Sequence, residues 1–306
     1  MGKTYDTAPA FKSALRQAAR NTGKRTGMSV PQLMQIFYFN RLAARVFTKQ
    51  PDGWLIKGGQ ALLVRYRGAA RLSQDIDLQS TYPDQDPDEA RHLVIEAASL
   101  DLGDFLRYTP TRFDAHSDEG RGGAQHFKVF LGSTPAADIK VDLVVGRTLS
   151  GTPERRTLKS AVDLEWPVDW PDVHLYPVID HIADKICAMY ERHGENAQFA
   201  SSRYRDLADL LLISQQERVH ADTTRDALLR EAQRRRNGGT VLLLPAAFET
   251  PNADWHTGYP KQAALVHGLN GCATLTEAAT AAAAFLDPLL DGTAQGVWNP
   301  SSATWC

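Results

Sequence analysis

The chain has 306 residues, of which 43% are hydrophobic and 23% charged, and this length suits one large domain or two modest ones. A formal net charge of −2 gives no overall attraction to nucleic acid, so any site for a polyanion must be local. No apolar run is long enough to cross a membrane, the N-terminal stretch is polar, and the three cysteines lack metal-binding spacing. We therefore expect a reduced, cytoplasmic protein that does not enter a membrane.

The first half of the chain is expected to mix helices with strands. Ser29 and Gln32 form a capping box ahead of apolar residues at helical spacing, and Asp86 followed by Pro87 marks another helix start. That second helix should run to about residue 100. Further elements predicted from hydrophobic periodicity are a helix over 60–66 and strands over 54–56, 74–80, 105–113, 126–131 and 139–145, with a loop at 114–123.

The composition changes near residue 165, where EWPVDWPDVHLYP predicts an ordered crossing segment rich in Trp and Pro. Beyond it the periodicity is helical, and Thr274 with Glu277 forms another capping box. Helices are expected over 178–193, 201–216, 223–236, 260–268 and 275–290. We therefore predict an α/β domain over residues 1–165 and a helical domain over 166–306.

Two aspartates separated by one residue stand in the strand predicted over 74–80. Because side chains alternate along a strand, Asp75 and Asp77 are expected on one face and Ile76 on the other. Two adjacent carboxylates repel and raise each other's pKa unless a cation such as Mg²⁺ compensates them. The alternative is an exposed strand face on which both acids are merely solvated.

Two further features favour the metal. Asp142 stands alone in the apolar stretch IKVDLVV, where a buried carboxylate is costly unless it is paired or bound to metal. Gly58 and Gly59 join a strand to a helix, a junction that presents backbone N–H groups to an anion, and Lys57 precedes them. Three carboxylates for two divalent ions and a loop for phosphates are the equipment of two-metal phosphoryl or nucleotidyl transfer.

These motifs carry a family resemblance. KGG, then S-x-D-x-D, then an aspartate in an apolar strand resembles the DNA polymerase beta superfamily of nucleotidyltransferases, with a longer spacing between the glycines and the aspartates than is usual there. HIADKICAMYERH and SSRYRDLADLLLI look like the signature of the AbiEii/AbiGii toxin family, which includes MenT-type toxins, and DWHTGYP with Trp255 and Tyr259 resembles its C-terminal region. The resemblance spans about residues 55–290. It implies an α+β fold, in which a mixed nucleotidyltransferase sheet with helices precedes a C-terminal helical bundle that contributes to the active site.

The resemblance also implies two site residues in the helical half. In that family a lysine on one helix and an Arg-x-x-Asp on the next complete the site, and the carried-over positions are Lys185 and Asp206. Lys185 and Asp206 fall at the edges of their apolar stripes, as side chains that reach into a cleft should. The alternatives are a snorkelling surface lysine and a plain i, i+3 salt bridge between Arg203 and Asp206. Asp209 is expected further round, toward solvent.

The activity implied is that of a Mg²⁺-dependent nucleotidyltransferase of EC 2.7.7 type, which moves a nucleoside monophosphate from a nucleoside triphosphate (NTP) to a hydroxyl. Asp75, Asp77 and Asp142 would hold Mg²⁺, and Asp142 would also favour deprotonation of the attacking hydroxyl. Lys185 would neutralise the leaving pyrophosphate and Asp206 would orient Lys185 or the nucleotide. The expected contacts to phosphate or nucleotide are Lys57, Gly58, Gly59, Arg71, Ser73 and Arg203.

The resemblance implies RNA as acceptor, in particular the tRNA 3′ end, a consequent block of translation, and a separately encoded antitoxin. Local basic clusters are compatible with RNA, namely Arg65, Arg67 and Arg71, and the triplet 234–236, although the triplet also suits a helix C-terminus. The alternatives are a small-molecule acceptor such as an antibiotic, a protein acceptor, and a catalytically silent member that binds only nucleotide or a partner.

Ser73 is a candidate for control by phosphorylation. In a continuous strand it would share a face with Asp75, where the triphosphate is expected. A phosphate there adds roughly 1.5 to 2 negative charges and would compete with the nucleotide for Mg²⁺ and Lys185. The alternative is that Ser73 is only a phosphate ligand or a turn residue.

Overall fold

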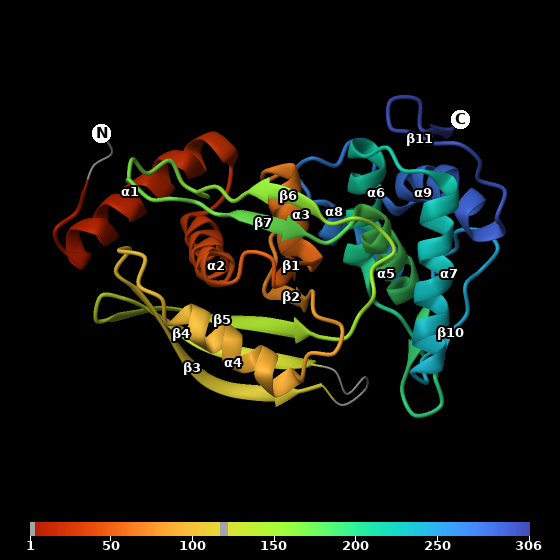
Figure 1. Cartoon of the computed structure of the whole chain (residues 1–306). Coiled ribbons are helices and arrows are strands. Elements are labelled where there is room, and N and C mark those ends of the chain that lie inside the picture. The colour runs from red at the N-terminus through yellow and green to blue at the C-terminus, as the bar shows by residue number, and fades with distance from the viewer. Residues whose placement is uncertain (1–3, 117–121) are drawn as a thin grey trace. The chain divides into compact units, whose positions relative to one another are not determined.

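The computed structural model describes residues 4–116 and 122–306, and the chain divides into two compact units (Figure 1). Unit 1 comprises Met1–Arg65, Leu72–Thr148 and Glu154–Leu175, and unit 2 comprises Tyr66–Arg71, Leu149–Pro153 and Tyr176–Cys306. Two short segments from the first half of the sequence thus belong to unit 2. The division into functional domains at residue 165 stays a prediction.

Unit 1 is built on a seven-stranded mixed sheet with the strand order β3-β4-β5-β2-β1-β7-β6. Its strands are β1 (Trp54–Ile56), β2 (Ile76–Ser80), β3 (Leu106–Ala115), β4 (Gly122–Leu131), β5 (Thr134–Val144), β6 (Glu154–Thr157) and β7 (Asp172–Leu175). β2 runs parallel to β5 and antiparallel to β1, and this register sets Asp77 opposite Asp142. The sheet therefore brings together two aspartates that are 65 positions apart in the sequence.

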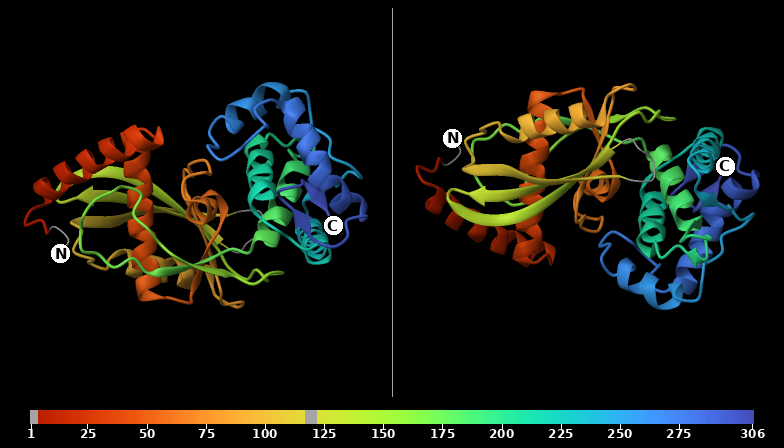
Figure 2. Two further views of the ribbon diagram at one scale, coloured as in Figure 1. Left: turned by 90° about the horizontal axis from the view of Figure 1, so that it is seen from above. Right: turned by 90° about the horizontal axis from the view of Figure 1, so that it is seen from below.

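Four helices accompany this sheet in the described part of unit 1: α1 (Ala8–Thr26), α2 (Val30–Lys49), α3 (Gly58–Tyr66) and α4 (Pro87–Ala98). The predicted caps are confirmed, because Ser29 and Gln32 form the capping box of α2 and Asp86 accepts N–H bonds at the start of α4. α1 packs on α2, which also contacts α4 and β5, and Figure 2 shows α2 crossing the sheet. Phe37 and Leu42 of α2 join Val141 of β5 in one buried apolar core.

The Trp- and Pro-rich segment is ordered, as predicted, and a buried arginine of α2 explains why. The Arg41 guanidinium lies 5.1 Å from the ring centroid of Trp166 and 4.9 Å from that of Trp170. Its Nε also donates to Asp104 Oδ2 at 2.7 Å. Because a buried cation needs such compensation, the two tryptophans pack on Arg41 and hold the segment on α2, while Asp104 pairs with the charge of Arg41.

Unit 2 is mainly helical. Its helices are α5 (Val178–Tyr190), α6 (Tyr204–Gln216), α7 (Ala221–Asn237), α8 (Trp255–Ala263) and α9 (Leu275–Asp291), and its short strands are β8 (Glu191–His193), β9 (Phe199–Ala200), β10 (Val241–Leu242), β11 (Trp298–Asn299) and β12 (Thr304–Trp305). Thr274 and Glu277 form the predicted capping box of α9. The predicted α+β class, a mixed sheet with helices followed by a helical bundle, is confirmed. Within residues 4–116 and 122–306, none of the helices combines the length and hydrophobicity that a membrane span requires.

The structure corrects several predicted boundaries. β2 begins at Ile76, so Asp75 lies in a bend before the strand, and Ser73 lies just ahead of that bend. The helix expected to run through residue 193 ends at Tyr190, because Glu191–His193 pairs with β9 and β10. α8 begins at Trp255, five residues before the predicted start. Part of the loop predicted over 114–123 lies outside the described residues.

Candidate active site

The three predicted carboxylates of unit 1 lie together. Asp75 stands in the bend before β2, Asp77 is the second residue of β2, and Asp142 lies opposite it on β5. Each offers an oxygen within 4.8 Å of the others, and all three side chains are half-buried. The alternative, an exposed strand face with solvated acids, does not describe this cluster. The parallel pairing of β2 and β5 brings aspartates from two strands together.

The electrostatics of this cluster centre on Asp77. Burial raises the pKa of Asp77, and the neighbouring Asp75 and Asp142 raise it further, to about 7, against the opposing effect of Lys57 and Lys140. An aspartate that holds its proton near neutral pH is one whose burial and acidic neighbours outweigh the positive charge nearby. The cluster therefore favours the binding of a cation.

Lys140 belongs to this cluster, although the sequence reasoning missed it. Its Nζ lies 2.7 Å from Asp142 Oδ2 and 3.2 Å from Asp75 Oδ2. Alternation along β5 was a usable signal, since residues 140 and 142 share a face of that strand. Burial disfavours the charged ammonium, but hydrogen bonds and charge from the two aspartates outweigh burial and raise the pKa of Lys140.

Gly58 is required by a close approach to the acid cluster. Its φ is +58°, and a Cβ atom at this position would lie 1.8 Å from Asp77 Oδ2. The Lys57 N–H donates to the Asp77 carbonyl at 2.8 Å, which holds the two segments together. Gly58 and the buried Gly59 form the first turn of α3, so the predicted phosphate loop is itself the N-terminus of a helix.

Ser73 contacts the cluster despite lying outside the strand. Its side chain is buried, and its Oγ donates to Asp75 Oδ1 at 3.0 Å. A bend therefore produces the proximity to Asp75 that the sequence reasoning expected from a continuous strand. The hydroxyl helps to orient Asp75, whichever further role it has.

The donor set of this cluster fits Mg²⁺. Hard divalent cations prefer oxygen ligands, and Mg²⁺ is commonly bound by a few carboxylates together with substrate phosphates. Asp75, Asp77 and Asp142 supply carboxylate oxygens at mutually close positions. Burial and the two acidic neighbours together outweigh Lys57 and Lys140 in raising the pKa of Asp77, so a bound cation would relieve the repulsion.

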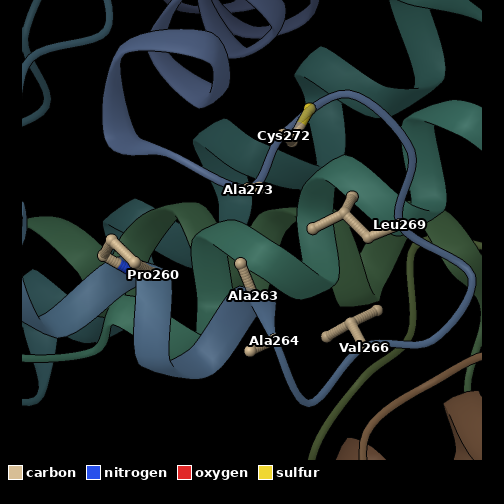
Figure 3. A pocket seen from close by; sticks show the side chains of 7 residues that line it. All are labelled: Pro260, Ala263, Ala264, Val266, Leu269, Cys272 and Ala273. Carbon is tan, nitrogen blue, oxygen red and sulfur yellow. The ribbon is translucent and has the colours of Figure 1, made fainter.

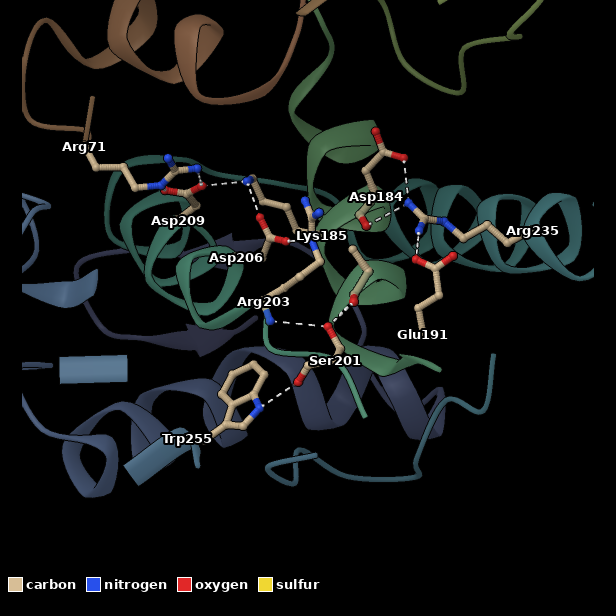
Figure 4. Close-up of polar contacts among 11 residues, drawn as sticks. Arg71, Asp184, Lys185, Glu191, Ser201, Arg203, Asp206, Asp209, Arg235 and Trp255 are labelled. Atoms are coloured by element: carbon tan, nitrogen blue, oxygen red, sulfur yellow. Dashed lines mark hydrogen bonds and ion pairs between the residues drawn. The ribbon is translucent and has the colours of Figure 1, made fainter. Parts of the chain in front are cut away.

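Unit 2 holds a second charged cluster, a row of five side chains (Figure 4). Lys185 Nζ on α5 donates to Asp206 Oδ1 at 3.0 Å and to Asp209 Oδ2 at 2.7 Å, both on α6. Arg203 pairs with the other oxygen of Asp206. Arg71 binds Asp209 through two hydrogen bonds, from Nε at 3.1 Å and Nη2 at 2.9 Å. The five side chains thus alternate in sign from Arg203 to Arg71.

The pKa shifts in this row follow from burial opposed by neighbouring charge. Burial disfavours the Lys185 ammonium, but Asp206 and Asp209 outweigh burial and raise its pKa. Burial likewise favours a protonated Asp206, yet Lys185 and Arg203 hold its pKa well below the usual range. Both side chains are therefore charged at neutral pH.

One expectation about this row is wrong, and one alternative considered for it is excluded. Asp209, expected toward solvent, is fully buried and binds Lys185 and Arg71. Lys185 is 6% exposed and is not a snorkelling surface lysine. The Arg203–Asp206 salt bridge considered as an alternative is present, but Asp206 also binds Lys185.

Trp255 packs against the N-terminus of α6, the helix that carries two residues of this row. Its indole N–H donates to the Ser201 carbonyl at 3.1 Å, and its ring packs edge-on against Tyr204. The Ser201 hydroxyl in turn donates to the Ala188 carbonyl of α5 at 2.8 Å. These contacts set the start of α6, the helix that carries Asp206 and Asp209.

The basic clusters proposed for RNA are mostly engaged within the protein. Arg65 Nε lies 2.9 Å from Glu154 Oε2. In the triplet, Arg234 and Arg235 both pair with Glu231, and Arg235 also binds Asp184 and Glu191. These pairings favour the structural interpretation of the triplet over RNA binding.

An apolar cavity of about 350 Å³ lies elsewhere in unit 2 (Figure 3). Its lining includes Pro260, Val266, Leu269 and Cys272, and burial raises the pKa of the Cys272 thiol. None of the seven lining residues is charged. The cavity is therefore unsuited to a triphosphate.

Comparison with known proteins gives a consistent picture. The family model described as "Nucleotidyl transferase AbiEii toxin, Type IV TA system" matches residues 41–271, a range that includes both charged clusters. Among solved structures, the chain is similar to MenT4, a nucleotidyltransferase toxin from Mycobacterium tuberculosis H37Rv, with 16% identity and a TM-score of 0.50 over 85% of this chain and 93% of that one. It is also similar to an H. pylori protein assigned as a nucleotidyltransferase, with 14% identity and a TM-score of 0.47 over 87% and 99% of the two chains. No curated protein matches the chain. At 16% identity, the likeness to MenT4 shows the fold.

Proposed function

The chain belongs to the AbiEii family of nucleotidyltransferase toxins of type IV toxin–antitoxin systems, and we propose that it transfers a nucleoside monophosphate from an NTP to RNA. The family implies a nucleotide substrate and an antitoxin partner. The observation that carries the proposal is the convergence of Asp75, Asp77 and Asp142 on one face of the sheet beside the first turn of α3. We further propose the tRNA 3′ end as acceptor, and hence a block of translation. A cytoplasmic location follows from this proposal, because NTPs and tRNA are found there.

We propose that Asp75, Asp77 and Asp142 hold Mg²⁺, which when bound would polarise the phosphoryl oxygens and lower the pKa of the attacking hydroxyl. The backbone N–H groups at Gly58 and Gly59 would bind phosphate oxygens, since the N-terminus of a helix favours anions. Asp142 would accept the proton of the attacking hydroxyl. Ser73 keeps Asp75 oriented through its hydrogen bond.

We propose that the row in unit 2 acts on the same nucleotide. Lys185 would neutralise charge on the departing pyrophosphate, and Asp206 would hold Lys185 in place. Arg71 and Arg203 stand at the two ends of the row as further contacts to phosphate or nucleotide. Lys57, next to Gly58, is proposed as another contact to phosphate. The support for these roles is the burial of Lys185, Asp206 and Asp209 together with the family match over residues 41–271.

The decisive experiment incubates the protein with labelled NTPs, Mg²⁺ and total tRNA and resolves the products on a denaturing gel. We expect label on tRNA with the parent protein and none with Asp77→Asn. If the label appears on a small molecule or on a protein, that molecule and not RNA is the acceptor. Nucleotide binding without any transfer would identify a catalytically silent member.

We also propose that phosphorylation of Ser73 switches the enzyme off. The Ser73 Oγ lies 3.0 Å from Asp75 Oδ1, so a phosphate there would add negative charge directly beside the carboxylates. Ser73→Glu should bind nucleotide poorly and lose transfer, whereas Ser73→Ala should retain part of the activity. Ser73→Glu with the parent's nucleotide affinity and rate would refute the switch and leave Ser73 as a simple phosphate or carboxylate partner.

A further inference from the structure

Asp209 of unit 2 binds two cations and has no role in the motif on which Lys185 and Asp206 were assigned. It is fully buried on α6. Its Oδ2 accepts from Lys185 Nζ at 2.7 Å, and its two oxygens together bind the Arg71 guanidinium at 3.1 and 2.9 Å (Figure 4). One carboxylate therefore fixes two cations that lie more than 100 positions apart in the sequence.

The row as a whole carries surplus positive charge. Arg71, Lys185 and Arg203 contribute three positive charges, and Asp206 and Asp209 contribute two negative ones, so the five side chains sum to +1. The Arg71 side chain remains 11% exposed and that of Arg203 42% exposed, whereas both carboxylates are buried. The carboxylates thus hold the cations from the buried side. The two arginines at the ends of the row reach the surface, and the side chain of Lys185 between them is 8% exposed.

Arg71 and Lys185 have chemistries that complement a polyphosphate. A guanidinium held by two parallel hydrogen bonds is fixed in orientation, and its planar, permanently charged fork matches the geometry of a phosphate. An ammonium carries three donors, and Asp206 and Asp209 occupy two of those on Lys185. Holding both groups before the ligand arrives lowers the entropy cost of binding it.

From this geometry we infer that Asp209 is a positioning residue that holds Lys185 and Arg71 as a joint binding site for the polyphosphate of the NTP and of the pyrophosphate product. This inference rests on the proposed function. It adds that the row of carboxylates and cations in unit 2 forms the anion-binding site. Asp206 and Asp209 then differ in role: Asp206 joins Lys185 to Arg203, and Asp209 joins Lys185 to Arg71.

The first test measures binding of inorganic tripolyphosphate in the presence of Mg²⁺ by titration calorimetry. Asp209→Asn keeps the size of the side chain and removes its charge, and we expect affinity at least tenfold below that of the parent. Glu191→Gln is the matched control, because Glu191 Oε2 lies 2.8 Å from Arg235 Nη1 in a neighbouring network of the same unit and binds neither Lys185 nor Arg71 in the contacts described. Both variants should have a lower Tm, but Glu191→Gln should bind within twofold of the parent.

A double-mutant cycle separates positioning from a purely structural effect. Arg71→Met should weaken tripolyphosphate binding severalfold, and adding it to Asp209→Asn should cause little further loss, because Asp209 acts partly through Arg71. Arg71→Met combined with Glu191→Gln should show the simple product of the two single effects. If Asp209→Asn does not fold, Arg71→Met and Arg71→Lys still test the site, and parent-like affinity in both would overturn the inference.

The tRNA-labelling reaction with the same proteins separates this inference from the proposed function. Transfer by the parent, together with parent-like tripolyphosphate binding by Asp209→Asn, overturns the role of Asp209 and leaves the proposed function intact. Tripolyphosphate binding that depends on Asp209, without transfer to any acceptor, supports the anion site and overturns the proposed function. A parent protein that does not bind tripolyphosphate overturns the inference directly.

Discussion

The two charged clusters of this protein use the same residue, aspartate, in opposite ways. In unit 1, Asp75, Asp77 and Asp142 face one another with Lys140 as the cation that pairs with two of them. In unit 2, Asp206 and Asp209 each lie between two cations. Burial raises the pKa of a carboxyl in either place, yet the pKa of Asp77 rises to about 7 and that of Asp206 falls.

Because burial acts in the same direction in both clusters, the difference shows that neighbouring charge decides whether the pKa of a buried aspartate rises or falls. An acid cluster with too little positive charge is destabilised internally and gains free energy when a cation arrives. A row in which every carboxylate is already paired is stable without a ligand and presents its cations ready oriented. Removal of a carboxylate should therefore have opposite effects on stability in the two clusters.

The largest expected effect is on transfer. Asp77→Asn should lower the rate of nucleotide transfer at least about 10³-fold, equivalent to roughly 4 kcal/mol of activation free energy, because a carboxylate proposed to bind metal is lost. Its free energy of unfolding without metal should be unchanged or higher, since repulsion with Asp75 and Asp142 is relieved. Single-turnover labelling of tRNA and urea unfolding measure the two quantities. An active variant, or an unfolded one, would contradict the assignment of the acid cluster.

The opposite result is expected in unit 2. Asp206→Asn leaves Lys185 and Arg203 short of a buried partner and should reduce the free energy of unfolding by about 3–5 kcal/mol. Urea unfolding followed by tryptophan fluorescence provides the measurement, with Asp163→Asn as a control at a salt bridge whose two side chains are 65% and 69% exposed. Equal, small losses from both substitutions would remove the contrast between the clusters.

The pH dependence of stability sharpens the same comparison. Asp77 titrates at about 7 in the folded protein, above its ordinary value of 3.8, so between about pH 4 and 7 the folded state holds a proton that the unfolded state has lost. The free energy of unfolding should therefore fall as pH rises through this window, by on the order of 2–4 kcal/mol, and then level off. Asp77→Asn should lack this fall when both proteins are unfolded in urea at pH 4.5 and pH 8 without metal. Saturating Mg²⁺ should stabilise the parent at pH 8 and leave Asp77→Asn little changed.

The smallest effect is expected at Lys140. Lys140→Met removes the cation that pairs with Asp75 and Asp142, and because its side chain is 38% exposed the loss of stability should be about 1 kcal/mol without metal. The same substitution should tighten Mn²⁺ binding, measured by electron paramagnetic resonance, since the ammonium and the ion compete for the same carboxylates. Unchanged Mn²⁺ affinity would mean that Lys140 does not compete with the metal.

Features that depend on neighbouring residues were predictable from the sequence. The capping boxes at Ser29 and Thr274 and the cap at Asp86 each involve partners within three positions, so local composition decides them. Strand β1 was predicted at its observed bounds because a short apolar run ends at Gly58. The residues of the acid cluster could likewise be predicted, since Asp75, Asp77 and Asp142 interrupt stretches whose pattern otherwise predicts strands.

Other features depended on contacts that the sequence does not display. β2 begins at Ile76, where its pairing with β5 begins, so hydrophobic pattern alone placed the boundary two residues early. Lys140 was missed because its partners were judged one strand at a time, and its contact to Asp75 arises only when β2 and β5 are adjacent.

Asp209 shows the limit most clearly. Helical periodicity predicted that Asp209 faces solvent. In the structure it is covered by Arg71, which is 138 positions away, and by Lys185, which is 24 positions away. The sequence by itself determined the local elements, the three acids and the family motif, because each is a property of residues close together in the chain. Only the tertiary structure decided which acids are paired, because a carboxylate's charge state depends on the cations that folding brings to it from distant segments.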